Sequence, residues 1–130
     1  MRKGGVVVGS RIVDASVKTK PWQALVQAAA IEIVGTGNPS VAPIQLIVTC
    51  YFKRPKGHYR TGKNAAIKRP DSPLYHCQLP DASKLLRAIE DALTGVCYRD
   101  DAQIYSSSCV KCWHDHRDYC VIRVSEVETY

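Results

Sequence analysis

The segment from Asp81 to Gly95 constrains the fold more than any other part of this sequence. At about 100° per residue, its apolar side chains fill one arc of a helical wheel and its polar side chains fill the other. Asp81 suits a helix N-cap and Thr94-Gly95 suits a helix end, so the sequence predicts a helix over 82–93. Its predicted core face consists of Leu85, Leu86, Ala88, Ile89, Ala92 and Leu93.

Two upstream segments supply the partners for that face. From Ile44 to Phe52, side chains alternate with the period of two that is typical of a strand with one face in a core. Pro21 suits the first turn of another helix, which should end at Gly35. Apolar residues at three- and four-residue spacing give this helix one packing face, made of Trp22, Leu25, Val26, Ala29 and Ala30.

The two ends of the chain are rich in β-forming residues. Val6 to Val13 predicts a short strand or hairpin, and Ile104 to Trp113 followed by a turn and Cys120 to Val127 predicts a C-terminal β-hairpin. A chain of 130 residues can bury one core but not two. We therefore expect a single α+β domain over residues 1–130, in which a mixed β-sheet packs against two main helices.

A basic loop is expected between Lys53 and Pro80, where no periodicity is sustained. Seven of the 18 Lys and Arg residues fall between Lys53 and Arg69 with no acid among them, and the net charge of the chain is +6. Nucleic acid is the commonest partner for such a cluster, although a mobile solvated loop is an equal alternative. The expected phosphate contacts are Lys53, Arg54, Lys56, Arg60 and Lys63, with His58, Tyr59 and Tyr75 as stacking surfaces for unpaired bases.

Acidic residues follow the basic loop. Taken alone, Asp81 is explained by helix capping and Asp100-Asp101 by an ordinary acidic turn. Carboxylates beside phosphates repel them unless a divalent cation lies between. The combination therefore indicates metal-dependent chemistry on nucleic acid, with Mg2+ as the expected ion and Mn2+ as its substitute.

The six cysteines favour no disulfide framework, because no signal-peptide core precedes them; we expect reduced, intracellular thiols. The most apolar stretch, Ala24 to Val34, falls short of the roughly 20 apolar residues of a membrane span. We discount His76-Cys77 as a nucleophile pair, because sequence neighbours seldom have the required geometry.

A zinc site is the competing interpretation of the C-terminal region, where Cys109, Cys112, His114, His116 and Cys120 have the right ligand types. If Ile104 to Trp113 is a strand, however, Cys109 and Cys112 point to opposite faces, whereas a zinc knuckle needs a tight turn. Thiols on a hairpin, without metal, are the simpler explanation.

The run PDASKLLRAIEDALTGVCYRDDAQI, from Pro80 to Ile104, resembles the signature of the RusA family of Holliday junction resolvases. That signature reads approximately P-D-x-D-N-L-x-K-x-x-x-D-A-L, followed by D-D-A-Q. Tyr51 to Asn64 is similar to the strand and basic loop of phage-type members, and Thr19 to Ala30 to their first helix. The resemblance implies an intertwined α+β homodimer that makes paired nicks across a four-way DNA junction, using Mg2+ held by aspartates.

The resemblance also implies roles for individual residues. Asp81 matches the first family aspartate and Asp101 the last, with Asp100 as its neighbour, so these three are the expected metal ligands. Arg87 occupies the position of the functional lysine. Asp91 matches the acid of D-A-L, which an ion pair with Arg87 also explains.

Two departures from the family pattern matter. Ser83 stands where the second aspartate is expected, and we expect Glu90 to compensate as a catalytic residue, although it lies two turns away, roughly 10 Å along the helix axis. Family members also carry a strand ahead of the segment that corresponds to Val6. Either the chain begins late or Met1 to Val13 takes over that role, since an unpaired sheet edge would be a stability problem.

The resemblance therefore predicts a homodimeric, Mg2+-dependent junction endonuclease for DNA recombination and repair. It would act in the cytoplasm of a bacterial host and be encoded by a phage or prophage. Two alternatives are a relative that binds branched DNA without cutting it, and a zinc-stabilised nucleic-acid-binding module centred on Cys109 to Cys120.

Overall fold

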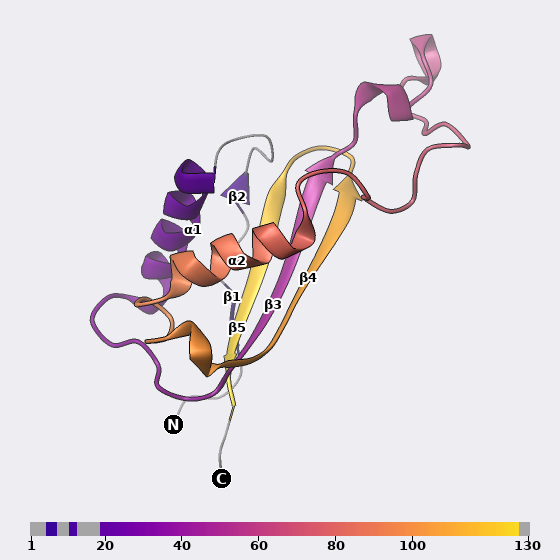
Figure 1. The fold of residues 1–130 in the computed structure, drawn as a ribbon. Helices are drawn as coiled ribbons and strands as arrows, with labels where there is room; N and C mark the ends of the chain where they lie inside the picture. The colour runs from indigo at the N-terminus through magenta and orange to yellow at the C-terminus, as the bar shows by residue number, and fades with distance from the viewer. Residues whose placement is uncertain (1–4, 8–10, 13–18, 128–130) are drawn as a thin grey trace.

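The computed structural model describes residues 5–7, 11–12 and 19–127. Two helices cover one face of a mixed β-sheet (Figure 1), which confirms the predicted α+β architecture. In chain order, the described elements are β1 (Gly5–Val7), β2 (Arg11–Ile12), α1 (Thr19–Val34), β3 (Ile44–Lys53), α2 (Ala82–Leu93), β4 (Ile104–His114) and β5 (Tyr119–Glu126). Single 3-10 turns add Lys56–His58, Gly62–Asn64 and Asp101–Gln103.

The core lies between the sheet and the two helices. The predicted inner side chains of β3 are all buried, from Ile44 at one end to Phe52 at the other, and they alternate with less buried neighbours. Helix α2 has the predicted bounds and ends before Gly95, whose positive φ of 87° a residue without Cβ adopts without strain. Leu25 alone of the predicted α1 face is largely exposed, because it lies at the border of the apolar arc.

The predicted C-terminal hairpin is wrong in its pairing. Both strands form, but β3 lies between them, parallel to β4 and antiparallel to β5. The turn that joins β4 to β5 therefore passes over the end of β3. Two hydrogen bonds mark this crossing, from Arg54 N to His114 O and from Lys53 N to the Asp118 carboxylate. The most apolar strand takes the central position because both of its edges are then paired inside the sheet.

The N-terminal strands cover the outer edge of β5. Both β1 and β2 pair antiparallel with it, so the described residues show the predicted short strand rather than a hairpin of two paired strands. The rest of the segment Met1 to Val13 lies outside the described residues. An unpaired sheet edge was expected to be a stability problem; here β1 and β2 pair the outer edge of β5 over part of its length.

The basic loop, 53–80, projects beyond the end of the sheet (Figure 1). It is folded on itself rather than structureless: Tyr59 and Lys68 form an antiparallel bridge, flanked by hydrogen bonds from Arg60 N to Ile67 O and from Arg69 N to His58 O. Neither helix of the described chain has the length and apolar character that crossing a bilayer requires.

Candidate functional site

Helix α2 and the start of β4 position the acidic side chains. Asp81 begins α2 with an extended backbone, φ −69° and ψ 140°, which is the predicted N-cap position. Its carboxylate makes no capping hydrogen bond, however, and lies 3.8 Å from the Lys84 ammonium group in an exposed ion pair. Since the carboxylate makes no capping hydrogen bond, helix capping does not account for this aspartate. The exposed ion pair does not account for it either, because pairs of this kind contribute little to stability.

Asp100 and Asp101 have different surroundings. The Asp100 carboxylate accepts a hydrogen bond from Ala102 N, and Gln103 returns two bonds by accepting from Arg99 N and Asp100 N. This capping box fixes the turn that precedes β4. Asp101 is exposed, and although its backbone oxygen accepts from Ile104 N, its carboxylate makes no hydrogen bond or ion pair with any residue that the structure describes. Asp100 therefore builds the turn, and Asp101 is presented by it.

Glu90 lies in the last turn of α2, near enough to Asp101 for their charges to interact. Burial raises the pKa of the Glu90 carboxyl, and the negative charges of Asp101 and Asp91 raise it further. Arg87 and a hydrogen bond from the Ser107 hydroxyl act in the opposite direction. Two carboxylates that repel each other at a partly buried position form a site to which a cation would be attracted.

The acids are spread along α2 rather than gathered at its first turn. Asp81 precedes Glu90 by nine residues, or about 14 Å along the helix axis. Within the described residues, no three acidic, histidine or cysteine side chains are close enough to hold one metal ion. Ser83 is exposed near Asp81, whereas Glu90 is directed toward Asp101 and Ser107. The predicted set of Asp81, Asp100 and Asp101 thus does not converge on one point.

Four of the five predicted phosphate contacts, Lys53, Lys56, Arg60 and Lys63, are exposed on the basic loop or at its entrance. The prediction that Arg54 contacts phosphate is wrong, because only 8% of the surface of Arg54 is exposed. Its guanidinium donates to Pro73 O at 2.7 Å and lies over the Trp113 ring at 5.5 Å. A buried arginine with these partners anchors the loop to the sheet and has no surface to offer a phosphate.

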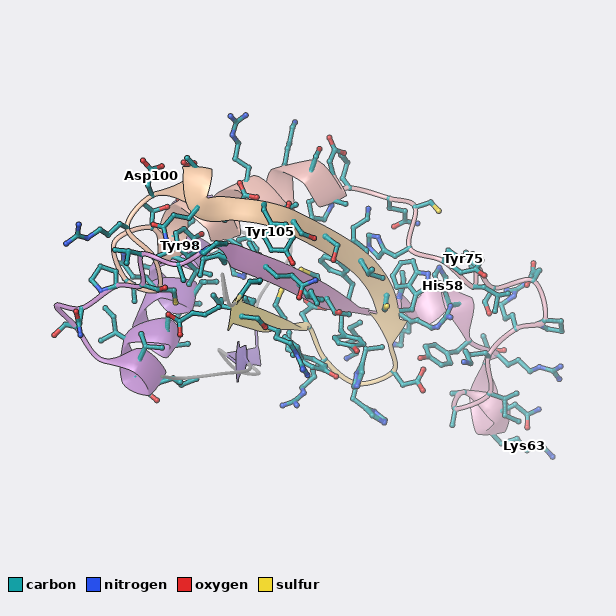
Figure 2. The ribbon with its side chains drawn as sticks, turned by 90° about the horizontal axis from the view of Figure 1, so that it is seen from below. His58, Lys63, Tyr75, Tyr98, Asp100 and Tyr105 are labelled. Atoms are coloured by element: carbon teal, nitrogen blue, oxygen red, sulfur yellow. The ribbon has the colours of Figure 1, made fainter. Side chains whose placement is uncertain are left out.

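The three aromatic residues of the loop also differ in whether their rings are free to stack on a base. His58 packs edge-on against Trp113, and the Tyr59 hydroxyl donates to the Asp115 carboxylate. Tyr75 is 75% exposed and remains a candidate stacking surface. Figure 2 shows Lys63 and Asp100 at opposite ends of the molecule, so basic tip and acidic turn are separated by the length of the sheet.

The cysteine and histidine residues at the C-terminal end of the described chain are not gathered as a zinc centre. Cys109 lies on the helix side of β4, where Cys50 and Cys120 are its neighbours across the sheet, while Cys112 lies on the other face. Cys50 and Cys120 are buried opposite each other, with their sulfurs 2.9 Å apart. The opposite orientation of Cys109 and Cys112 follows from the period of the strand.

Gln103 is a functional residue to which sequence reasoning gave no role. Besides closing the capping box, its amide nitrogen donates to Ser40 O and Ala42 O, so it ties the acidic turn to the segment before β3. The spacing Asp-x-x-Gln at 100–103 is a capping-box signal that could have identified it. Ser107, which lowers the pKa of Glu90, carried no comparable signal.

The donors at Glu90 and Asp101 fit a hard divalent cation. Mg2+ usually binds one or two protein carboxylates and completes its coordination with water and substrate phosphates. One exposed unpaired carboxylate and one with a raised pKa match that requirement among the described residues, and the Ser107 hydroxyl adds a further oxygen. The site therefore combines an acidic pair on a rigid frame with a basic surface farther along the molecule.

The described fold is thus a mixed sheet with two helices on one face, and acidic side chains lie on α2 and on the turn before β4. The family model described as Endodeoxyribonuclease RusA matches residues 2–125, which is nearly the whole chain. The chain belongs to this family of endodeoxyribonucleases. A comparison with curated proteins gives no match.

Proposed function

We propose that this protein is a Mg2+-dependent endodeoxyribonuclease that resolves four-way DNA junctions by paired nicks, in DNA recombination and repair. The observation that carries the proposal is the placement of Glu90 in the last turn of α2 and of Asp101 on the turn before β4, two carboxylates close enough for the charge of Asp101 to raise the pKa of Glu90. Membership of the endodeoxyribonuclease family supports the reaction class. Its setting is proposed to be the cytoplasm of a bacterial host, with a phage or prophage gene as its source.

Asp101 and Glu90 would hold the ion, and Asp81 is proposed as a further acidic group toward the loop end of α2. When bound, Mg2+ supplies Lewis-acid chemistry, since it withdraws charge from the phosphate and favours attack by water. A water oxygen would attack phosphorus in line while the water gives a proton to solvent, and the bond to the leaving sugar oxygen would break as that oxygen takes up a proton. Asp100 keeps the turn in place and need not touch the ion.

Arg87 is proposed to stabilise negative charge on the reacting phosphate. It is exposed on the polar face of α2, and its charge acts on Glu90. A guanidinium offers two parallel donors to phosphate oxygens, whereas lysine offers a compact point charge, so arginine can serve here with a different contact geometry. The interaction would strengthen as charge develops in the transition state.

The basic loop is proposed to bind the DNA backbone through Lys53, Lys56, Arg60 and Lys63. These side chains are exposed, and the projecting loop reaches well beyond the sheet (Figure 1). A four-way junction has arms that extend over a large area, so contacts far from the cleaved phosphate are useful for recognising it. Because each neutralised phosphate releases counterions, affinity should fall steeply with salt concentration.

A homodimer is proposed because two symmetric nicks require two sites. Four-way junctions are close to twofold symmetric, and a twofold dimer presents the same site to both cut strands. The described sheet leaves the outer edge of β4 unpaired and exposes Ile47 and Val110 on the face away from the helices. Sedimentation equilibrium should give about twice the mass of 14.4 kDa, whereas a monomer at working concentration would contradict this part of the proposal.

The decisive experiment compares cleavage of a synthetic four-way junction with cleavage of a linear duplex of the same sequence, with and without Mg2+. Symmetric, Mg2+-dependent nicks in the junction alone, abolished in Asp101→Asn, would support a resolvase that is active despite Ser83. Tight junction binding without nicks would instead favour a relative whose site is disabled by Ser83. The absence of both binding and cutting would refute the proposal.

A further inference from the structure

Lys111 connects β4 to the segment that leads into α2. Its ammonium group donates to the backbone oxygen of Gln78 at 2.6 Å and to that of Pro80 at 2.9 Å. The two acceptors lie 33 and 31 residues earlier in the chain. Lys111 is therefore a cross-link between distant segments, and one of its acceptors belongs to the residue immediately before Asp81.

The direction of the side chain follows from strand register. Lys111 is paired with Cys50 of β3, whose side chain is buried beneath the helices, so Lys111 is also on the helix side of the sheet. It is partly buried, and its positive charge lowers the pKa of the neighbouring His76. An ammonium group in this position needs acceptors, and two backbone carbonyls provide them.

His76 gives the same segment a second anchor. Its ring is buried between Phe52, at 4.3 Å, and Trp113, at 4.4 Å between ring centroids. Burial and the charge of Lys111 both lower the pKa of His76, so the ring stays neutral in this apolar setting. The chain from 76 to 80 is thus held at both ends, while Cys77 and Leu79 between them are exposed.

Asp81 itself has no comparable support among the described residues. Its carboxylate makes no capping bond, and its ion pair with Lys84 is exposed at 3.8 Å. Its backbone oxygen accepts from Leu85 N, which fixes it to α2 but not to the sheet. The packing of α2 in the core holds Asp81 relative to the sheet, and the hydrogen bond from Lys111 to Pro80 O adds a direct connection between β4 and the residue before Asp81.

We propose that Lys111 is a positioning residue of the nuclease site, which sets the place of Asp81 by fixing the carbonyls of Gln78 and Pro80. Two of its three N–H donors are used in this way, so it acts through the backbone and not as a phosphate contact. The same strand begins directly after the turn that presents Asp101. One rigid element thereby relates the two aspartates. The inference rests on the proposed function.

The test compares Lys111→Met with Lys111→Arg, which keeps charge and donors, and with Arg123→Met as a charge-matched control on the far face of the sheet. In Lys111→Met, we expect single-turnover cleavage at saturating enzyme to fall about 100-fold, since small misplacements of site residues have effects of that size. Junction affinity without divalent ions should stay within about threefold, because Lys111 itself binds no phosphate. Lys111→Arg should recover much of the cleavage rate, and Arg123→Met should cut normally.

Hydrogen exchange on the DNA-free protein supplies a readout that does not depend on activity. In Lys111→Met, amides over 77–86 should exchange about tenfold faster while those of β3 keep their protection. Cleavage within about threefold of the natural protein would overturn the proposal, as would a decrease of cleavage and junction affinity in equal proportion. Unchanged exchange over 77–86 would overturn it as well. If the natural protein cuts no junction, the proposed function fails, and the exchange arm still decides whether Lys111 holds this segment.

Discussion

The acidic turn before β4 and the basic loop after β3 differ in how their charged groups are held. Around Asp101, a capping box and the amide of Gln103 tie the turn to Ser40 and Ala42. The basic loop is joined to the sheet mainly near its base, through Arg54 and the aromatic packing around Trp113, and its tip at Lys63 lies far from the core (Figure 2).

This difference corresponds to two different functions of charged groups, catalysis at a phosphorus atom and binding of a phosphate backbone. Chemistry at a phosphorus atom requires charges at fixed positions, because catalytic contributions depend strongly on geometry. Binding a phosphate backbone requires charges within reach, because the energy comes largely from counterion release. Substitutions in the two regions should therefore change different measured quantities.

Among the substitutions that compare these two regions, and apart from Asp101→Asn, the largest effect is expected at Glu90. Glu90→Gln should reduce the junction cleavage rate about 100-fold, because removing one carboxylate from a two-carboxylate site weakens the hold on the ion. Asp71→Asn is the charge-matched control, since the Asp71 carboxylate is exposed in the loop after β3, outside α2 and the acidic turn. Single-turnover rates measure both. Intact Mg2+-dependent cleavage in Glu90→Gln would end the idea that Glu90 compensates for Ser83.

The basic loop should show the opposite behaviour. Replacing Lys56, Arg60 and Lys63 together with Gln should weaken junction binding about 30-fold at low salt and lower the salt slope by about 0.9 for each phosphate that is no longer neutralised. Once the enzyme is saturating, the cleavage rate should be almost unchanged. Fluorescence anisotropy over a salt series measures the slope, with Arg123→Gln as the control. An unaltered slope would remove the loop from the DNA interface.

Arg54 sharpens the distinction because it is basic but buried. Arg54→Gln should lower the free energy of unfolding by about 2 kcal/mol, since buried partners of a charged donor are left unsatisfied. Arg60→Gln, a substitution of an exposed arginine, should leave stability almost unchanged. Urea denaturation compares the two variants. Equal stability of the natural protein and Arg54→Gln would contradict the anchoring role.

The smallest expected effect is the pH dependence of stability that Glu90 contributes. The pKa of Glu90 is higher in the folded state than in the unfolded state. At pH values between these two pKa values, the folded protein therefore binds more protons than the unfolded chain. Stability from this group therefore falls as pH rises through that window. Above the window, metal-free Glu90→Gln should melt about 1–2 °C higher than the natural protein, since a few tenths of a kcal/mol are involved.

Addition of Mg2+ should reverse that order. An ion bound only by the folded state raises the melting temperature of the natural protein and has little effect on Glu90→Gln. Thermal melts at several pH values, with and without Mg2+, measure both shifts. A melting temperature of the natural protein that rises with pH no less steeply than that of Glu90→Gln would contradict the assigned direction.

The elements with strong local patterns were predictable from sequence. The bounds of α2 and the buried face of β3 follow from periodicity and from Gly95, and both are confirmed. The acids and the basic loop were also located by motif and composition. These features depend on neighbours in the chain, which a sequence displays directly.

Three features depended on contacts between distant segments, and here sequence alone was insufficient. The C-terminal strands were predicted as a hairpin, but β3 separates them, because pairing is decided by competition among all strands for the central position. In the sequence, Arg54 does not differ from its basic neighbours. Its hydrogen bond to Pro73 O and its contact with the Trp113 ring distinguish it in the structure. The carbonyls that Lys111 holds lie more than 30 residues away in the chain.

The sequence by itself determined the element types, the sign and location of the charges, and the family resemblance that the match over residues 2–125 confirms. The tertiary structure alone decided which charges meet: Glu90 with Asp101, Asp100 with its own turn, and Asp81 apart from both. The physical reason is the difference in sequence range between the two kinds of interaction. Propensity and periodicity act over a few residues, whereas burial and charge interaction depend on spatial neighbours that only the folded chain brings together.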